Sequence, residues 1–143
     1  MVEDSFHLGV KALIRNKEGA VLVLKANLAT FKSPTKEHWD LPGGRIHKRE
    51  NIETALRREV EEEIGVEDLE ILELLDASIS KMRLSFIDMG LILFTYLCRI
   101  SNDQEIKLTD NEHTQFRWVN PREAALLLST KFADSLVQKV SNL

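Results

Sequence analysis

Residues 44–66 read GRIHKRENIETALRREVEEEIGV and contain three glutamates at positions i, i+3 and i+4. On a helix of about 100° per residue, Glu59, Glu62 and Glu63 lie within an arc of roughly 100° and therefore share one face. Two unit charges about 4 Å apart at an effective dielectric near 20 repel by about 4 kcal/mol. Such a cluster needs water or a cation to compensate it, and a divalent metal ion is its natural ligand.

The same stretch predicts one amphipathic helix over residues 51–64. Gly65 is placed to end this helix, because glycine readily adopts the left-handed conformation that closes many helices. The apolar stripe of the helix consists of Ile52, Ala55, Leu56, Val60 and Ile64. The three glutamates lie beside this stripe, at the edge of the face that we expect to be buried.

Length and composition are those of one ordinary domain, which we expect to span residues 1–143. No apolar run approaches the eighteen or so residues of a membrane span, and the N-terminus lacks the pattern of a secretory signal. We therefore expect a cytoplasmic protein with no membrane partner. A formal charge of −4 argues against nucleic acid as a partner. Cys98, the only cysteine, lies in an apolar run and should be a buried, reduced thiol.

The residues before position 44 predict strands, a long loop and a tight turn. Two apolar runs within residues 8–25, joined by Asn-Lys-Glu-Gly at 16–19, indicate a β-hairpin. Residues 26–38 are polar and aperiodic, so they form either a substrate lid, in which Phe31 could stack on a base, or a solvated loop. Residues 39–41 predict a short strand that leads into Pro42-Gly43-Gly44, where the backbone can turn sharply and approach a ligand.

The residues after position 66 predict three more strands and a closing helical region. Residues 69–80 alternate with a slip at 71–72, which is typical of a strand with a bulge, and the apolar residues 89–98 suit a central strand buried on both faces. A polar loop over 101–111 precedes a short strand at 116–119. Asn120 and Pro121 then begin a helix through 128, followed by a segment at 132–140. This order indicates an α/β or α+β fold with a mixed sheet between helices.

Every defining position of the Nudix box is filled, so the chain closely resembles the MutT-like Nudix hydrolases. These positions are Gly44, Glu50, Arg58, Glu59, Glu62, Glu63 and Gly65, with aliphatic Val60 and Val66. The resemblance implies an α/β class, the Nudix fold, which is an α/β/α sandwich with a mixed β-sheet. It also implies hydrolysis of a nucleoside diphosphate linked to another moiety, such as a nucleoside triphosphate or nucleotide sugar, with release of a nucleoside monophosphate.

The expected cofactor is Mg²⁺ or Mn²⁺, held mainly by the carboxylates of Glu59, Glu62 and Glu63. Mg²⁺ takes oxygen ligands and is usually bound by a few carboxylates together with substrate phosphates. A backbone carbonyl at Gly43 or Gly44 could reach the same ion because the turn abuts the start of the helix. The resemblance favours the carbonyl of Gly43.

The resemblance also implies supporting and catalytic roles for four acidic or basic residues. Arg58 and Glu50 are expected to pair and to hold the loop and the helix in register, although a purely structural salt bridge would look the same. The candidate general base within the box is Glu62. Glu112, on a later loop, stands where many family members have an additional acid that binds metal or acts as base, although it could also be a solvated loop residue. Arg49 stands where the family usually has glycine, so the loop before Glu50 is expected to follow a different path.

The main alternative is a binding module that keeps the fold to sense a nucleotide or RNA without cleaving it. Loss of a box carboxylate or an appended DNA-binding domain would favour that alternative, and the sequence has neither. Isomerisation of an isoprenoid diphosphate would require a cysteine in the pocket, for which Cys98 is poorly placed. The partner is expected to be a small nucleotide-type substrate, and the resemblance leaves a homodimer open.

Overall fold

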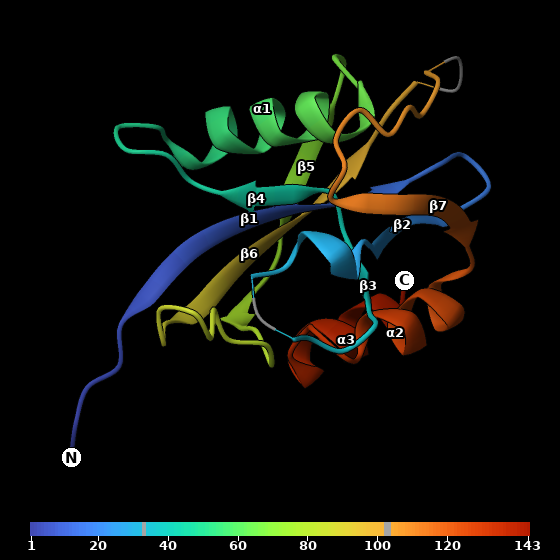
Figure 1. The fold of residues 1–143 in the computed structure, drawn as a ribbon. Coiled ribbons are helices and arrows are strands. Elements are labelled where there is room, and N and C mark those ends of the chain that lie inside the picture. Colours follow the sequence, from blue (N-terminus) through green and yellow to red (C-terminus); the bar gives the residue numbers. More distant parts are fainter. Residues whose placement is uncertain (33, 102–103) are drawn as a thin grey trace.

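A seven-stranded mixed sheet separates one long helix from two shorter ones in the computed structural model, which describes residues 1–32, 34–101 and 104–143 (Figure 1). The strands are β1 (Phe6–Arg15), β2 (Val21–Ala26), β3 (Trp39–Asp40), β4 (Gly43–Arg45), β5 (Glu70–Ile79), β6 (Gly90–Arg99) and β7 (His113–Val119). One face carries α1 (Ile52–Ile64), and the other carries α2 (Pro121–Leu128) and α3 (Asp134–Ser141). This arrangement confirms the predicted α/β/α sandwich with a mixed sheet.

The predicted loops are only partly covered by this description. The loop at 26–38 contains one turn of 3₁₀ helix, η1 (Leu28–Thr30), while residue 33 lies outside the described residues. Residues 102 and 103 of the predicted polar loop also lie outside them. Within the part of the chain that the structure describes, no helix has both the length and the apolar character needed to cross a membrane.

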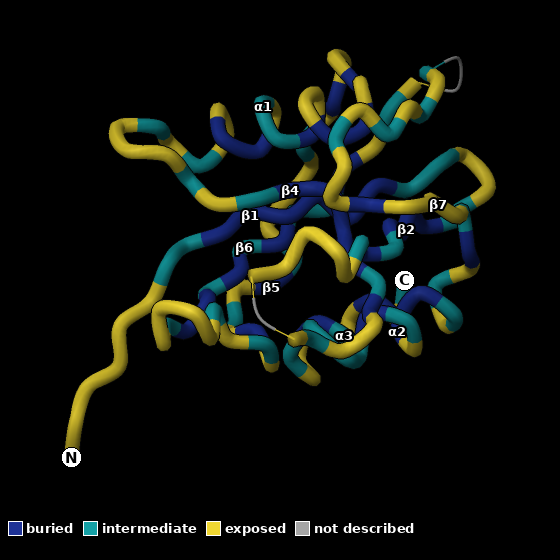
Figure 2. Tube along the Cα trace, viewed as in Figure 1, coloured by how far each residue is buried: buried dark blue, intermediate teal, exposed yellow. Residues whose placement is uncertain are grey.

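Two apolar cores lie on opposite faces of the sheet, because side chains alternate between the faces of each strand. Val10 of β1 and Leu22 of β2 belong to the core beneath α1, whereas Leu13 and Val23 belong to the core above α2 and α3. Figure 2 shows the buried residues concentrated along the sheet and on the inner faces of the helices. The near-continuous apolar runs in the sequence therefore reflect strands that are covered on both sides.

The predicted β-hairpin at residues 8–25 forms with both strands and the turn, but the antiparallel ladder between β1 and β2 is very short. β1 and β2 pair only at Arg15 and Val21, after which they diverge. The edge of β1 that β2 would occupy is taken by β4, which pairs with residues 9–11 of β1. β1 forms its long ladder with β6 in parallel, and β2 pairs with β7 and β3. The strand in the middle of the sheet is consequently β1 rather than β6.

The predicted helix boundaries and the predicted bulge agree with the structure. The side chain of Asn51 caps α1 by accepting a hydrogen bond from the backbone N–H of Thr54, and Gly65 ends it with a left-handed φ of 71°. Asn120 caps α2, with Pro121 at its first position. The register between β5 and β6 shifts between residues 71 and 73, where the slip was predicted, and again between residues 74 and 76.

Cys98 lies in β6 and is fully buried. Burial raises the pKa of its thiol to about 12, so at pH 8 only about one thiol in ten thousand is ionised. We expect an aromatic disulfide reagent to label the native protein at pH 8 at least about a hundredfold more slowly than the protein unfolded in urea. The absorbance of the released thiolate measures both rates, and a Cys98→Ala variant gives the blank. Equal rates in the two states would contradict the burial of this thiol.

Candidate active site

The C-terminal half of α1 presents the predicted acidic residues toward the turn that contains β4. Among the three box glutamates, Glu63 is the buried one and lies with the apolar stripe, while the side chain of Glu62 is 59% exposed. Glu59 lies between these extremes and is 16% exposed. The predicted acidic face of α1 therefore extends from the protein interior, at Glu63, to the solvent, at Glu62.

Arg58 connects this helix to the loop before it. Its guanidinium donates two hydrogen bonds to Glu50, at 2.6 and 2.8 Å, and one to the carbonyl of Arg45 at 3.3 Å. It also donates to Glu59 Oε1 at 2.9 Å and to Glu62 Oε2 at 3.2 Å. Hydrogen bonds from Arg58 lower the pKa of Glu50 to about 2. The structure thus brings Arg58 and Glu50 together as expected, and Arg58 orients two of the box carboxylates.

The Gly43-Gly44 turn lies directly against two of the carboxylates. The backbone N–H of Gly43 donates a hydrogen bond of 2.6 Å to Glu63 Oε1. A β-carbon on Gly44 would lie 2.5 Å from the carboxyl carbon of Glu59, and one on Gly43 would lie 2.0 Å from the carbonyl oxygen of Val10. Gly43 also has a φ of +143°, a conformation that side chains rarely permit. Both glycines are needed for this close approach.

Lys11 lies buried beneath the turn and shares Asp40 with Lys131, which is largely buried, and the sequence analysis identified neither lysine. Lys11 Nζ is 3.1 Å from Asp40 Oδ1, and it also donates to the carbonyls of Leu41 and Gly43, at 3.3 and 3.5 Å. Lys131 Nζ is 2.5 Å from the other oxygen of Asp40. Lys11 was detectable in principle, because it interrupts an apolar run in β1. Lys131 lies 91 residues from Asp40, so no local pattern links the two.

The opposite charges of Asp40, Lys11 and Lys131 shift one another's pKa values and oppose the effect of burial. Burial alone would raise the pKa of Asp40, but Lys11 and Lys131 outweigh it and keep the pKa of this carboxyl well below its usual range. Burial lowers the pKa of Lys11, yet Asp40 and Glu63 raise it overall. For Lys131 burial prevails, and its pKa is lowered. In Asp40 the lysines outweigh burial, whereas in Glu63 burial outweighs Lys11. Burial therefore raises the pKa of Glu63 to about 8.

The segment before β7 brings further polar side chains to the end of α1. Backbone N–H groups of Lys107 and Thr109 donate to the carbonyls of Ile64 and Glu63, each at 3.0 Å, and the hydroxyl of Thr109 donates to the carbonyl of Glu62. These bonds satisfy carbonyls that a helix end leaves without partners. They also fix the segment so that its next residues face the box.

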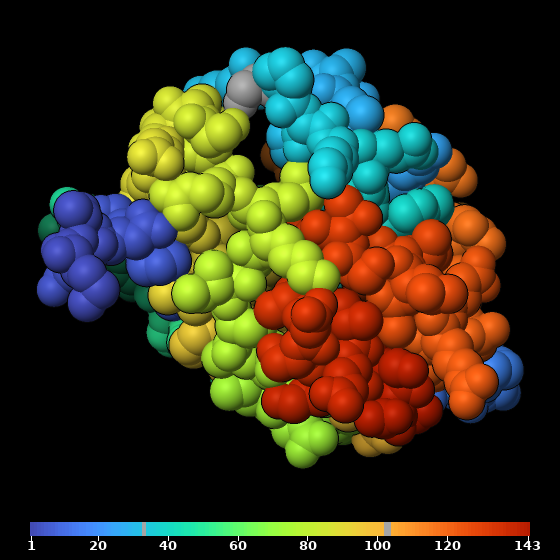
Figure 3. Space-filling model, turned by 90° about the horizontal axis from the view of Figure 1, so that it is seen from below, coloured from blue at the N-terminus to red at the C-terminus, as the bar shows by residue number. Residues whose placement is uncertain are grey.

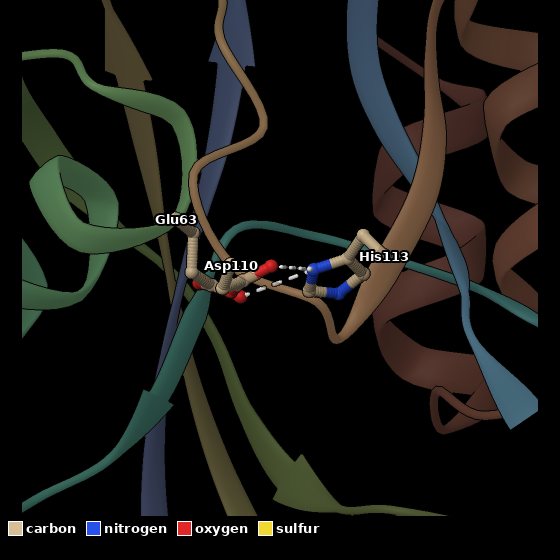
Figure 4. A group of neighbouring side chains, drawn as sticks. All are labelled: Glu63, Asp110 and His113. Carbon is tan, nitrogen blue, oxygen red and sulfur yellow. Dashed lines mark ion pairs between the residues drawn. The ribbon is translucent and has the colours of Figure 1, made fainter. Parts of the chain in front are cut away.

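Asp110 and His113 are the residues that reach Glu63 (Figure 4). His113 Nδ1 lies 3.4 Å from Glu63 Oε2 and 3.6 Å from Asp110 Oδ1. Burial lowers the pKa of His113. The sequence analysis missed both residues, although Asp110 and His113 flank the predicted Glu112 at a spacing of three. Glu112 itself is exposed, and partial burial together with Asp110 and Glu59 raises the pKa of its carboxyl.

The oxygen atoms available at the site suit a divalent cation. Glu59 Oε1 and Glu63 Oε1 accept hydrogen bonds from Arg58 and Gly43, whereas the second oxygen of each receives none from a described residue. Oxygen atoms of this kind, with a backbone carbonyl beside them, are what Mg²⁺ and Mn²⁺ bind. Within the described chain, the one group of three acidic or histidine ligand atoms closer than 4.8 Å to one another is Glu63, Asp110 and His113. Glu59 and Glu63 lie against the turn, while Glu62 is exposed and contacts Arg58, so the three box carboxylates do not converge that closely.

The family model for the NUDIX domain matches residues 5–140. The chain belongs to the Nudix family. The predicted Nudix box at residues 44–66 includes the last two residues of β4 and all of α1, whose contacts form the site described above. The resemblance inferred from the sequence is thereby confirmed.

Relatives and solved structures agree with this membership. The nucleoside triphosphatase NudI of Escherichia coli is 33% identical over 118 residues, which are 78% of this chain and 79% of that protein. Nudix hydrolase 5 of Arabidopsis thaliana is 38% identical over 71 residues, half of this chain but 22% of the plant protein. A MutT protein from Methanosarcina mazei Go1 superposes with a TM-score of 0.75 at 24% identity, covering 99% and 95% of the two chains. The structural likeness establishes the Nudix fold, and the family model with its hydrolase relatives places the chain among Nudix hydrolases.

The two adjacent glycines of the turn should respond differently to the same substitution. Gly43→Ala forces a β-carbon into the backbone of β1, so we expect the free energy of unfolding to fall by about 1–3 kcal/mol or more. Gly44→Ala meets only the movable carboxylate of Glu59, so its melting temperature should change little while Mn²⁺ affinity falls about tenfold. Thermal unfolding and a Mn²⁺ titration followed by electron paramagnetic resonance measure the two effects. Equal melting temperatures for both variants would contradict this difference.

Proposed function

We propose that this chain is a single Nudix domain that hydrolyses a pyrophosphate bond in a nucleoside diphosphate linked to another moiety, and that it requires Mg²⁺ or Mn²⁺. The observation that carries the proposal is the intact box around the Gly43-Gly44 turn, where Arg58 and the turn orient Glu59 and Glu63 and leave one oxygen of each for a cation. Glu62 and the Gly43 carbonyl complete the proposed ligand set. The product is a nucleoside monophosphate.

Each residue of the site then has a defined role. When bound, a divalent cation supplies the positive charge that the phosphate and leaving oxygens of the substrate need. Arg58 keeps Glu59 and Glu62 in position, and Glu50 fixes Arg58 through two hydrogen bonds. Lys11 supports the carbonyl of Gly43 from beneath. An acidic protein can in this way accept an anionic substrate without a basic surface.

Glu112 is the proposed general base, with Glu62 as the alternative. The side chain of Glu112 receives no hydrogen bond from a described residue and lies on the segment that the helix end anchors, next to Asp110 and His113. Glu62 Oε2, by contrast, already accepts a hydrogen bond from Arg58. A carboxylate without a fixed donor is the better placed of the two to take a proton from an attacking water.

The substrate's nucleoside is proposed to enter a hollow on the opposite side of the sheet from α1. Figure 3 shows this hollow between the cyan segment that follows η1 and the yellow-green connection between β5 and β6. Lys32 Nζ lies 4.9 Å from the ring centre of Phe86, so the two segments approach each other here. Phe31 precedes Lys32 on the first segment and Phe86 belongs to the second; both rings are exposed and could stack on a base. A cytoplasmic location and a homodimer stay predictions.

Removal of one carboxylate tests the hydrolase proposal. In Glu59→Gln the shape is kept but a negative charge is lost, so we expect kcat/KM with Mg²⁺ to fall by about a hundredfold or more, with little change in melting temperature. Wild type and variant are incubated with nucleoside triphosphates first, because NudI is a nucleoside triphosphatase, and then with nucleotide sugars, ADP-ribose and dinucleoside polyphosphates. Products are separated by chromatography. Glu61→Gln, on the exposed side of the same helix, is the matched control and should retain activity.

Two outcomes would change the conclusion about function. Full activity of Glu59→Gln would remove this residue from the site. If the wild type binds nucleotides but cleaves none of them with either ion, the domain is a non-hydrolytic sensor instead.

The proposed base is tested by Glu112→Gln, which should lower kcat by about 10²–10⁴ and leave KM nearly unchanged. Glu105→Gln, an exposed acid of the same segment, is the control. Steady-state kinetics of both variants and of Glu62→Gln measure the effect. A rise in KM alone would assign Glu112 to substrate binding, and a loss of kcat in Glu62→Gln but not in Glu112→Gln would make Glu62 the base.

A further inference from the structure

Glu63, Asp110 and His113 form a compact group at the buried end of the site, and only Glu63 belongs to the Nudix box. Glu63 comes from the last turn of α1, Asp110 from the segment before β7, and His113 from the first position of β7 (Figure 4). The exposed fractions of the three side chains are 3%, 23% and 6%. The carboxylates of Glu63 and Asp110 both point toward the imidazole ring.

The nitrogen that faces the two carboxylates has no hydrogen-bond partner among the described residues. His113 Nδ1 is buried, and it is the one such side-chain atom that the described part of the chain contains. Buried polar atoms of native proteins are nearly always paired, so this one indicates a missing partner at the centre of the group. Glu63 Oε1 is held by the N–H of Gly43, which leaves Oε2 facing the ring.

The spacing of these atoms suits a metal ion better than a direct hydrogen bond. Hydrogen bonds between nitrogen and oxygen usually measure about 2.7–3.2 Å. Nitrogen and oxygen ligands about 2.1 Å from a tetrahedral cation lie about 3.4 Å from each other. The two contacts of His113 Nδ1 are 3.4 and 3.6 Å long, and all three ligand atoms lie within 4.8 Å of one another.

We propose that Glu63, Asp110 and His113 form a mixed nitrogen and oxygen site for a first-row transition cation, with Zn²⁺ or Co²⁺ bound in preference to Mg²⁺. Imidazole favours such ions, whereas Mg²⁺ is bound mainly by oxygen ligands. The site differs in chemistry from the all-oxygen set proposed for hydrolysis, and it shares Glu63 with that set. A transition cation bound here therefore changes the occupancy of the Mg²⁺ site through the common carboxylate.

The test uses metal binding without nucleotide, so its outcome is separate from that of the hydrolase proposal. Chelator-treated protein is titrated with Co²⁺ and followed by visible absorption, because tetrahedral Co²⁺ absorbs far more strongly than six-coordinate Co²⁺. Titration with Zn²⁺ in a calorimeter gives stoichiometry and affinity. We expect the strong absorption in the wild type, and we expect it to persist in a hundredfold excess of Mg²⁺.

Three variants assign the ligands. His113→Phe should lose the absorption and one equivalent of Zn²⁺, and Asp110→Asn should weaken binding about tenfold or more. His38→Phe removes the other buried histidine, whose Nδ1 lies 2.8 Å from the carbonyl of Lys36, and should bind as the wild type does. If the melting curve shows that His113→Phe does not fold, Asp110→Asn, at the least buried of the three positions, still allows the decision.

The proposal is overturned if the wild type shows no strong Co²⁺ absorption, which would leave the three side chains sharing only a proton or a water molecule. It is also overturned if the hundredfold excess of Mg²⁺ removes the absorption, since the proposed preference for a transition cation over Mg²⁺ would then be absent. Unchanged binding in a folded His113→Phe, or in Asp110→Asn, would exclude that residue as a ligand.

Discussion

The close approach of the Gly43-Gly44 backbone to β1 is the constraint on which the rest of the site depends. β4 pairs with residues 9–11 of β1 and so occupies the edge where β2 would otherwise continue. The same backbone donates to Glu63 and lies against the carboxylate of Glu59. One contact between two short segments thus separates the first two strands and orients two acidic side chains. Only residues without a β-carbon allow it.

A chain of alternating positive and negative side chains then supports this backbone from below. Lys131, from the connection between α2 and α3, pairs with Asp40. Asp40 also pairs with Lys11, which donates to the carbonyl of Gly43. Because of desolvation, a buried ion pair adds little net stability. Loss of one partner nevertheless lowers the stability strongly, because the other charge stays buried without a partner. The network therefore defines a geometry more than it adds stability. Its position directly beneath the turn means that the geometry it defines is that of the proposed metal ligands.

The sequence predicts those features that depend on local chemistry. The helix over residues 51–64, its end at Gly65 and the register slip in β5 are each determined by residues a few positions apart. Pairing between distant segments is different. Nothing within residues 8–25 indicates that β4 displaces β2 from β1, because that outcome depends on glycines some twenty to thirty residues later.

The same distinction applies to the site. Spacing within one helix places Glu59, Glu62 and Glu63 together, and the Arg58 and Glu50 pair follows from the resemblance. Asp40 with Lys131, and Glu63 with His113, join segments that are far apart in the chain. Lys11 can be recognised in the sequence as a lone lysine in an apolar strand. Its partners cannot, because folding brings them from distant parts of the chain.

The end of α1 favours the proposed cation, although the whole chain carries a formal charge of only −4. A helix macrodipole places partial negative charge at its C-terminus, where cations are favoured and carboxylates are not. The last turn of α1 contains no basic residue and carries Glu62 and Glu63 instead. The segment at 107–109 satisfies the carbonyls by neutral hydrogen bonds, which leave the charge in place. Arg58 compensates the exposed end of the cluster, whereas at the buried end desolvation raises the pKa of Glu63 to about 8 although Lys11 lies nearby.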